Sequence, residues 1–137
     1  GLLGATVTAV PGASRVYLGG VVTYDTAMKA RLAGVRTEVL DAMGPVAEQT
    51  VAEMALGVQT LTGADWALAV TGVAGPGPQD GHQPGEVWIA VVGPQIGAQR
   101  SAAPMSRRID LSGDRGQIRE QCVRAALELL LQVMSPV

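Results

Sequence analysis

Two apolar runs, joined by a loop of fourteen residues, most constrain what this chain can fold into. The first run covers residues 66–71 and follows a segment with helical periodicity, and the second covers residues 86–92. A strand that is buried on both faces has this nearly continuous apolar character, because helices cover both sides of its sheet. Since helical and strand patterns alternate along the chain, the sequence predicts a layered α/β fold.

The other periodicities predict elements around these two runs. Apolar spacing and capping residues predict helices over residues 2–10, 26–33, 37–43 and 46–61, and a last helix opened by residues 112–115. Further strands are predicted over residues 16–24, which are β-branched and aromatic, and within residues 99–111, centred on 106–111. The helix at 46–61 has one apolar face, formed by Val51, Met54, Ala55, Val58 and Leu61.

Composition excludes several classes of protein. The chain of 137 residues is the size of one domain, and its net charge of −2 leaves no electrostatic footprint for nucleic acid. Its apolar runs fall well short of the roughly 20 residues of a membrane helix. Hydrophobic residues make up 47% but aromatic residues only 3%, so the core must be aliphatic. With Cys122 as the single cysteine no internal disulfide can form, and we expect a reducing cytoplasmic location.

Lys29 is the only lysine, whereas the other nine basic residues are arginines. Arginine keeps its proton in proteins, but a desolvated lysine can lose its proton and act as a base or nucleophile. Lys29 is therefore a candidate base. The alternative is that one lysine has survived by chance in an arginine-rich chain.

The loop at residues 72–85, called the glycine loop below, contains five glycines and three prolines. A long loop directly after a buried strand is often functional. Thr71 stands at the end of that strand, and Gly72 and Gly75 would let backbone N–H groups approach a bound group closely. The pattern matches neither a P-loop nor a dinucleotide fingerprint, and the alternative is a plain connection between strands.

The start of the last predicted helix is a candidate anion site. Free N–H groups and the helix dipole favour an anion there, and Arg115 adds a forked cation. The alternative is an ordinary helix start, with Ser112 as the N-cap and Arg115 in solvent. His82, the only histidine, lies in the glycine loop, a poor place for an oriented base. One histidine and one distant cysteine do not make a zinc site, so we expect no metal.

Four blocks of the sequence together resemble one known family. They are YLGGVVTYDTAMKARLAGV, VAEQTVAEMALGV, TGVAGPGPQDGHQPGEVWIAVV and SGDRGQIR, in this order and spacing. In this respect the chain resembles the CinA C-terminal domain family, the nicotinamide mononucleotide amidohydrolases (deamidases) of pyridine nucleotide salvage. The resemblance covers essentially the whole chain, residues 1–137, as one domain.

The resemblance implies a three-layer α/β/α sandwich with a mixed central sheet. It also implies a Ser-Lys type amidase without a cofactor, which converts nicotinamide mononucleotide into nicotinate mononucleotide and ammonia. By position in the family blocks, Lys29, Tyr24 and Thr71 match the active-site lysine, tyrosine and threonine, and Arg115 matches the arginine of the last block. Lys29 would take the proton of a serine hydroxyl. Tyr24 and Thr71 would bind the Lys–Ser pair or the oxyanion.

Substrate contacts follow from the same resemblance. Backbone N–H groups between Gly72 and Gly75 would assist at the oxyanion, and Arg115 with its helix N-terminus would suit the 5′-phosphate. The family differs from this chain in two ways. Its serine lies in a Glu-Ser-Cys-Thr-Gly-Gly block whose last glycine corresponds to Gly1, so we expect the first strand and the nucleophile to lie upstream and the chain as given to be inactive. Residues 77–84 also differ from the family, which leaves the substrate preference open.

Other functions remain open at this stage. One alternative is a non-catalytic binding or dimerisation module of a competence/damage-inducible CinA-type protein, and another is a catalytically dead sensor of pyridine nucleotides. We expect a homodimer, because alanine-rich helices with few aromatic residues leave room for an interface. In some family members the domain follows a larger nucleotide-acting domain. We expect neither nucleic acid nor a membrane as a partner.

Overall fold

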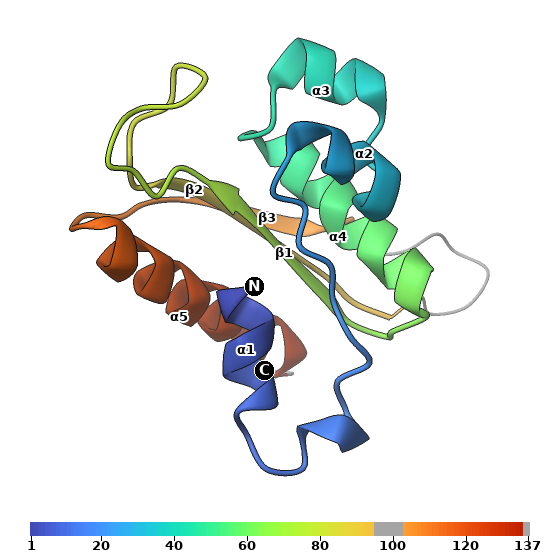
Figure 1. Cartoon of the computed structure of the whole chain (residues 1–137). Helices are drawn as coiled ribbons and strands as arrows, with labels where there is room; N and C mark the ends of the chain where they lie inside the picture. Colours follow the sequence, from blue (N-terminus) through green and yellow to red (C-terminus); the bar gives the residue numbers. More distant parts are fainter. Residues whose placement is uncertain (95–102, 136–137) are drawn as a thin grey trace.

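The computed structural model of the protein describes residues 1–94 and 103–135 (Figure 1). Residues 99–102 of the predicted strand region lie outside the described part of the chain. The elements, in chain order, are α1 (Leu2–Thr8), the 3-10 helix η1 (Ala13–Arg15), α2 (Thr26–Ala33), α3 (Thr37–Met43), α4 (Glu48–Thr62), β1 (Ala67–Gly72), β2 (Glu86–Val92), β3 (Met105–Asp110) and α5 (Arg115–Met134).

The strands form a three-stranded sheet in the order β1-β2-β3. Both pairings are antiparallel, with Thr71 opposite Trp88 and Val87 opposite Ile109. The strands predicted from the apolar runs are therefore confirmed. The expectation of a mixed sheet is not met among the described strands, because each of these strands runs antiparallel to its neighbour.

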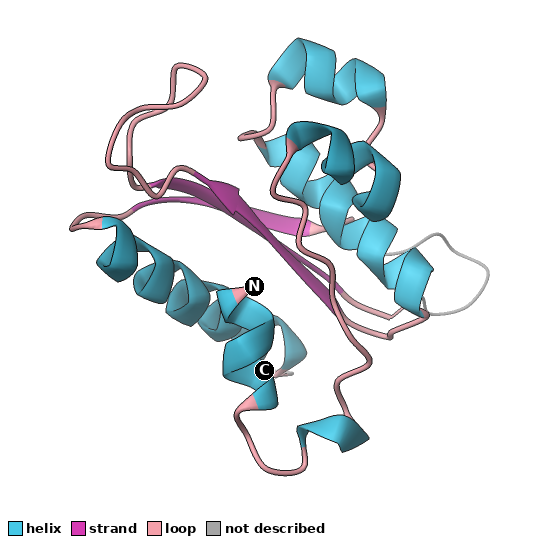
Figure 2. Cartoon of the chain, in the orientation of Figure 1, coloured by secondary structure: helices cyan, strands magenta, loops and turns pink. Residues whose placement is uncertain are grey.

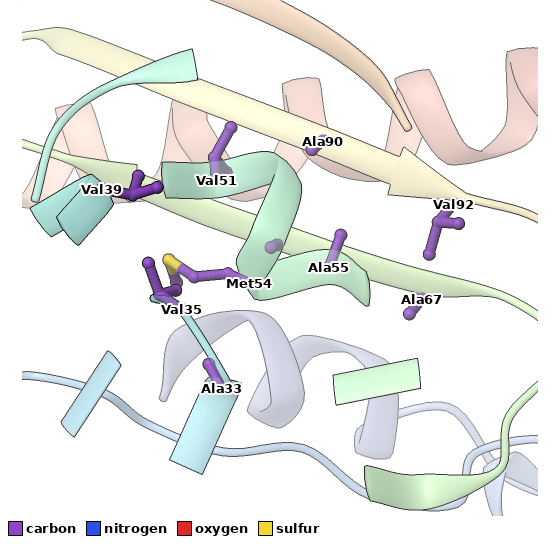
Figure 3. Close-up of a cluster of buried hydrophobic side chains, with 10 residues drawn as sticks. Ala33, Val35, Val39, Val51, Met54, Ala55, Ala67, Ala90 and Val92 are labelled. Atoms are coloured by element: carbon purple, nitrogen blue, oxygen red, sulfur yellow. The ribbon is translucent and has the colours of Figure 1, made fainter. Parts of the chain in front are cut away.

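Helices cover both faces of this sheet, as the α/β prediction requires (Figure 2). On one face lie α2, α3 and α4, and on the other lie α1 and α5. The side chains of β2 alternate between two hydrophobic clusters, as the period of two in a strand dictates. The cluster under α4 contains Ala90 and Val92 (Figure 3), and the cluster under α5 contains Val87, Ile89 and Val91.

Capping residues and glycines in the sequence correctly predict most of the helix ends. Asp25 caps α2, where its side chain accepts a hydrogen bond from the N–H of Ala27 at 2.8 Å. Gly34 and Gly63 end α2 and α4 in the left-handed conformation that glycine adopts freely. One predicted face residue is wrong, because Leu61 is exposed at the last turn of α4.

The predicted strand over residues 16–24 is also wrong. After η1 the chain runs extended to α2, but it joins no ladder among the described strands. Its β-branched and aromatic residues are typical of a strand, but Val16, Leu18, Val22 and Tyr24 are all exposed. The pattern indicated extended backbone correctly, but a strand also needs a neighbour that accepts and donates its hydrogen bonds.

None of the described helices combines the length and the apolar character that a bilayer crossing requires.

Candidate active site

Lys29 is buried at the start of α2, with 7% of its surface exposed. The Asp25 cap fixes the direction of the helix, and Lys29 lies one turn into it. Its Nζ donates a hydrogen bond of 3.0 Å to the backbone carbonyl of Thr23, which is itself buried. The ammonium group is therefore held against the turn that precedes the helix.

Burial lowers the pKa of Lys29 below its ordinary value, because removing water disfavours the charged form. The carboxylate of Asp25 opposes this effect and raises the pKa, but burial is the larger cause. A lysine with a lowered pKa holds a larger fraction of neutral amine near neutral pH. The direction of this shift is the one that favours a lysine acting as a base.

Tyr24, Gly75 and Arg115 meet in one hydrogen-bonded group, although they come from three distant parts of the sequence. Arg115 donates from Nη1 to the carbonyl of Gly75 at 2.8 Å and from Nη2 to the hydroxyl of Tyr24 at 3.4 Å. The side chain of Tyr24 is otherwise exposed. Arg115 therefore joins the start of α5, the glycine loop and the residue before the α2 cap.

Thr71 is buried near the end of β1, and its Oγ1 donates a hydrogen bond of 2.6 Å to the carbonyl of Pro45. A hydroxyl has one proton, so this contact leaves the oxygen of Thr71 as an acceptor. In this arrangement Thr71 can accept a hydrogen bond from an amine or a hydroxyl, but it cannot also donate one to an oxyanion.

Gly72 ends β1 where the backbone of β2 comes close. A Cβ at Gly72 would lie 2.7 Å from the carbonyl oxygen of Glu86, so strand packing alone accounts for this glycine. The N–H of Val73 donates to the same carbonyl at 3.0 Å. Successive N–H groups in a strand point to opposite edges. The N–H of Gly72 therefore points to the edge of β1 that has no partner strand among the described residues.

The N-terminus of α5 is capped by Asp114 rather than by Ser112. The carboxylate of Asp114 accepts from the N–H of Gln117 at 2.9 Å, and the Gln117 side chain accepts from the N–H of Asp114 at 2.9 Å. This capping box satisfies two of the donors that an anion would use. At this end of α5, the Arg115 side chain is therefore better suited to bind an anion than the backbone N–H groups of the helix terminus.

Four of the predicted site residues, Lys29, Tyr24, Gly75 and Arg115, are connected through one turn, whereas Thr71 contacts Pro45 and Gly72 packs against β2. Lys29 contacts the carbonyl of Thr23, and the next residue, Tyr24, carries the contact to Arg115 and the glycine loop. Sequence analysis missed the carbonyl groups of Thr23 and Pro45, since backbone acceptors carry no signature of residue type. Within residues 1–94 and 103–135, no group of three or more acidic, histidine or cysteine side chains could hold a metal ion.

The chain matches the model of the CinA C-terminal domain over residues 1–134. It is 41% identical to a CinA-like protein of Frankia casuarinae over 98% of this chain, and 36% identical to a protein of Bacillus subtilis named as competence-damage inducible, again over 98%. In each case it spans 30% of the length of the relative.

Solved structures agree with this assignment. A competence/damage inducible protein from Agrobacterium tumefaciens has a TM-score of 0.89 and 33% identity, over 98% of this chain and 79% of that one. A CinA superfamily protein from Klebsiella pneumoniae has a TM-score of 0.86 and 35% identity, over 95% of this chain and 78% of that one. The chain belongs to the CinA family, in which it corresponds to the CinA C-terminal domain.

Proposed function

We propose that this domain is an amidohydrolase that cleaves the carboxamide of nicotinamide mononucleotide to nicotinate mononucleotide and ammonia. The observation that carries the proposal is Lys29, a buried lysine whose pKa is lowered by desolvation, one turn from Tyr24. Family membership supports an amidase reaction, because the segments that contain Lys29, Thr71 and Arg115 resemble those of the CinA C-terminal domain family.

The nucleophile in this proposal is a serine upstream of Gly1, as the resemblance implies. The position of Gly1 supports this arrangement, because a Cβ at Gly1 would lie 3.7 Å from the Val22 side chain. Val22 is two residues before Tyr24. A residue four positions before Gly1 would lie within about 13 Å of it in an extended chain, which keeps such a serine in the neighbourhood of the turn that carries Tyr24 and Lys29.

The reaction then proceeds through an acyl-enzyme. Neutral Lys29 takes the serine proton while the serine oxygen bonds to the carboxamide carbon, and the carbonyl electrons move to oxygen. When the carbonyl re-forms, the C–N bond breaks, and the leaving nitrogen takes the proton from Lys29 and departs as ammonia. Water, deprotonated by Lys29, attacks the ester and releases the carboxylate, and the serine regains its proton.

Two groups at the end of β1 support this chemistry. The N–H of Gly72 points to the open edge of the strand and is suited to donate to the developing oxyanion. The Oγ1 of Thr71 donates to Pro45 and is therefore an acceptor. We assign Thr71 to orient the Lys29 amine or the serine hydroxyl rather than to bind the oxyanion.

Arg115 is assigned to the 5′-phosphate of the substrate. Its guanidinium is held by the carbonyl of Gly75 and the hydroxyl of Tyr24, and these contacts use two of its five N–H groups. The others can form the paired hydrogen bonds that suit a phosphate. The capping box of α5 leaves this role to the Arg115 side chain.

Ammonia release from nicotinamide mononucleotide by the full-length protein tests the proposal. Lys29→Met should lower the rate by about 10²- to 10⁴-fold, which is the usual contribution of a general base. Arg31→Ala removes an exposed basic residue two positions further along α2 and should leave the rate unchanged. A folded full-length protein that releases no ammonia, or Lys29→Met with wild-type activity, would contradict the assignment.

A second candidate is a non-catalytic binding module of a larger competence/damage-inducible protein. It is favoured by the names of relatives and by the 30% of their length that this chain spans. If this module is the function, the full-length protein will bind a partner in solution without turnover of nicotinamide mononucleotide. A substituted serine in the upstream block would favour the same alternative.

We extend the proposal to a cytoplasmic homodimer in which this domain is fused to or paired with an N-terminal nucleotide-acting domain. The exposed side chains of Val16, Leu18 and Val22 support self-association, because adjacent apolar side chains on a surface are typical of interfaces. Sedimentation of the full-length protein measures the oligomeric state directly, and a monomer at micromolar concentration would contradict this extension.

A further inference from the structure

The glycine loop is an ordered hairpin. At its base, the N–H of Val73 donates to the carbonyl of Glu86 at 3.0 Å and the N–H of Gly85 donates to the carbonyl of Val73 at 2.7 Å. Further out, Gln79 and His82 exchange two backbone hydrogen bonds of 3.0 and 2.9 Å. The two limbs of the loop are therefore held together along much of their length.

The carboxylate of Glu86, at the base of the glycine loop, is mostly buried. The side chain of Glu86 is 14% exposed and sits between two basic groups from different elements. Nδ1 of His82 lies 3.0 Å from its Oε1, and Nη2 of Arg108 lies 3.7 Å from its Oε2. Arg108 is also paired with Asp110 at 3.2 Å. A carboxylate with so little exposure requires such partners, because desolvation of an unpaired charge is costly.

The same loop holds Arg115 through its other limb. The carbonyl of Gly75 accepts from Arg115, and a Cβ at Gly75 would lie 3.1 Å from Cβ of Pro84. Pro84 is two residues after His82, so the limb that contacts Glu86 also packs against the limb that contacts Arg115. A continuous path of contacts thus leads from Glu86 through the loop to Arg115 and on to Tyr24.

We propose that His82, anchored on the Glu86 carboxylate that Arg108 also contacts, is a positioning residue that holds the glycine loop so that the Gly75 carbonyl orients Arg115 beside Tyr24. This inference rests on the proposed function in one respect: the expected change in kinetics follows only if Arg115 binds the phosphate of the substrate. His82 is the only histidine of the chain and belongs to the glycine loop. The proposal gives it a structural role in the site, separate from the proton transfers at Lys29.

The test compares His82→Ala and His82→Asn in the full-length protein. Asparagine keeps an N–H donor on Cγ, the place that Nδ1 occupies in histidine, whereas alanine has no side-chain donor. Glu128→Gln is the matched control, since it removes a carboxylate from the exposed Arg124–Glu128 pair on α5, whose two side chains are 81% and 62% exposed. The measurements are amide hydrogen exchange of loop peptides, the rate of phenylglyoxal modification of Arg115 relative to Arg119, and the kinetics with nicotinamide mononucleotide.

We expect His82→Ala to speed amide exchange in the loop and modification of Arg115, while Arg119 is unaffected. KM should rise about tenfold with kcat nearly unchanged, as expected when a hydrogen bond to a charged group is lost from substrate binding. His82→Asn should reverse most of both effects, and Glu128→Gln should behave as wild type. A purely structural histidine would speed loop exchange without changing Arg115.

Two results would overturn the inference. If amide exchange in the loop is unchanged in His82→Ala, His82 does not hold the loop. If loop exchange is faster but modification of Arg115 is unchanged, the loop does not orient Arg115. Because exchange and modification need no turnover, they decide the inference even if nicotinamide mononucleotide is not cleaved, and the failure of the proposed function is then recognised separately by the absence of ammonia.

Discussion

Arg115 donates a hydrogen bond to the hydroxyl of Tyr24 across 91 positions of the sequence and connects the first turn of α5 to the residue before the α2 cap. The second contact of the guanidinium, to the Gly75 carbonyl, fixes its plane. A planar fork can make both contacts at once, whereas a lysine ammonium is a compact point charge on a flexible stem.

Arg115 is expected to bind substrate, so Arg115→Ala should raise KM for nicotinamide mononucleotide by about 10- to 100-fold, the usual value of a hydrogen bond to a charged group. Arg115→Lys should recover only a small part of this loss, because lysine cannot reproduce the paired geometry. The affinity of each variant can be measured by isothermal titration with the substrate or its product. An unchanged affinity in Arg115→Ala would exclude the phosphate assignment.

Lys29 should make the stability of the domain depend on alkaline pH. Because burial lowers its pKa in the folded state, the unfolded state binds more protons than the folded state between that lowered pKa and 10.5. The free energy of unfolding therefore rises with pH in this window. Lys29→Met lacks the effect, so its stability advantage over wild type should be largest below the lowered pKa and shrink toward pH 10.5.

Urea denaturation of wild type and Lys29→Met at a series of pH values between 7 and about 10 measures this difference. The comparison of the two proteins cancels the titration of the other groups. A difference that stays constant over the whole series would mean that Lys29 keeps its ordinary pKa, and it would remove the basis for its role as a base.

Gly57 should be irreplaceable although it lies inside α4, where alanine normally stabilises a helix by about 1 kcal/mol. A Cβ at Gly57 would collide with the backbone carbonyl of Ala33 in α2. We expect Gly57→Ala to lower the free energy of unfolding by more than about 3 kcal/mol, since neither helix backbone can yield without moving its whole layer.

The control for this prediction is Gly63→Ala at the end of α4. Gly63 has a φ of 70° and open space around it, so alanine there should cost only about 1 kcal/mol for the left-handed backbone. Urea midpoints of the two variants give the comparison. Equal losses would show that α2 and α4 accommodate the added Cβ, and would contradict the close approach of the two helices at Gly57.

Cys122 should react slowly with thiol reagents. Burial raises the pKa of its thiol to about 11, so the reactive thiolate is scarce at pH 8. Modification by iodoacetamide, followed by mass spectrometry of the Cys122 peptide, should be about two orders of magnitude slower than for an exposed cysteine with a pKa near 8.5. In urea the rate should rise to the unfolded value. Rapid modification of the native protein would contradict this burial.

The elements that sequence analysis located well are those with local causes. The sequence offers Asp25 or Thr26 as the cap of α2 and Gly34 as its end, and the structure has Asp25 and Gly34, whose contacts lie within a few residues. At the start of α5, Ser112 is the cap only in the alternative of an ordinary helix start, and the structure has Asp114 instead, because Gln117 completes a capping box with it. Both residues are good caps, so only the register of the helix distinguishes them.

Long-range features could not be derived from residue patterns alone. Residues 16–24 have the β-branched and aromatic residues of a strand, yet pairing depends on a neighbour that the composition does not encode. The contact of Arg115 with Gly75 joins residues 40 positions apart, and that of Glu86 with Arg108 joins two strands whose pairing the residue pattern does not encode. Lys29 is a candidate base from the sequence because it is the only lysine among the basic residues. Its burial and its hydrogen bond to the Thr23 carbonyl can be known only from the fold.

The alternation of β2 between the two hydrophobic clusters has a consequence for how the domain comes apart. Ala90 and Val92 contribute to the cluster under α4, and Ile89 and Val91, their immediate neighbours, contribute to the cluster under α5. Neither helical layer can melt without disturbing side chains that the other layer needs. A small domain built on one shared central strand is therefore expected to unfold in a single cooperative transition, in which damage on either side of the sheet weakens both.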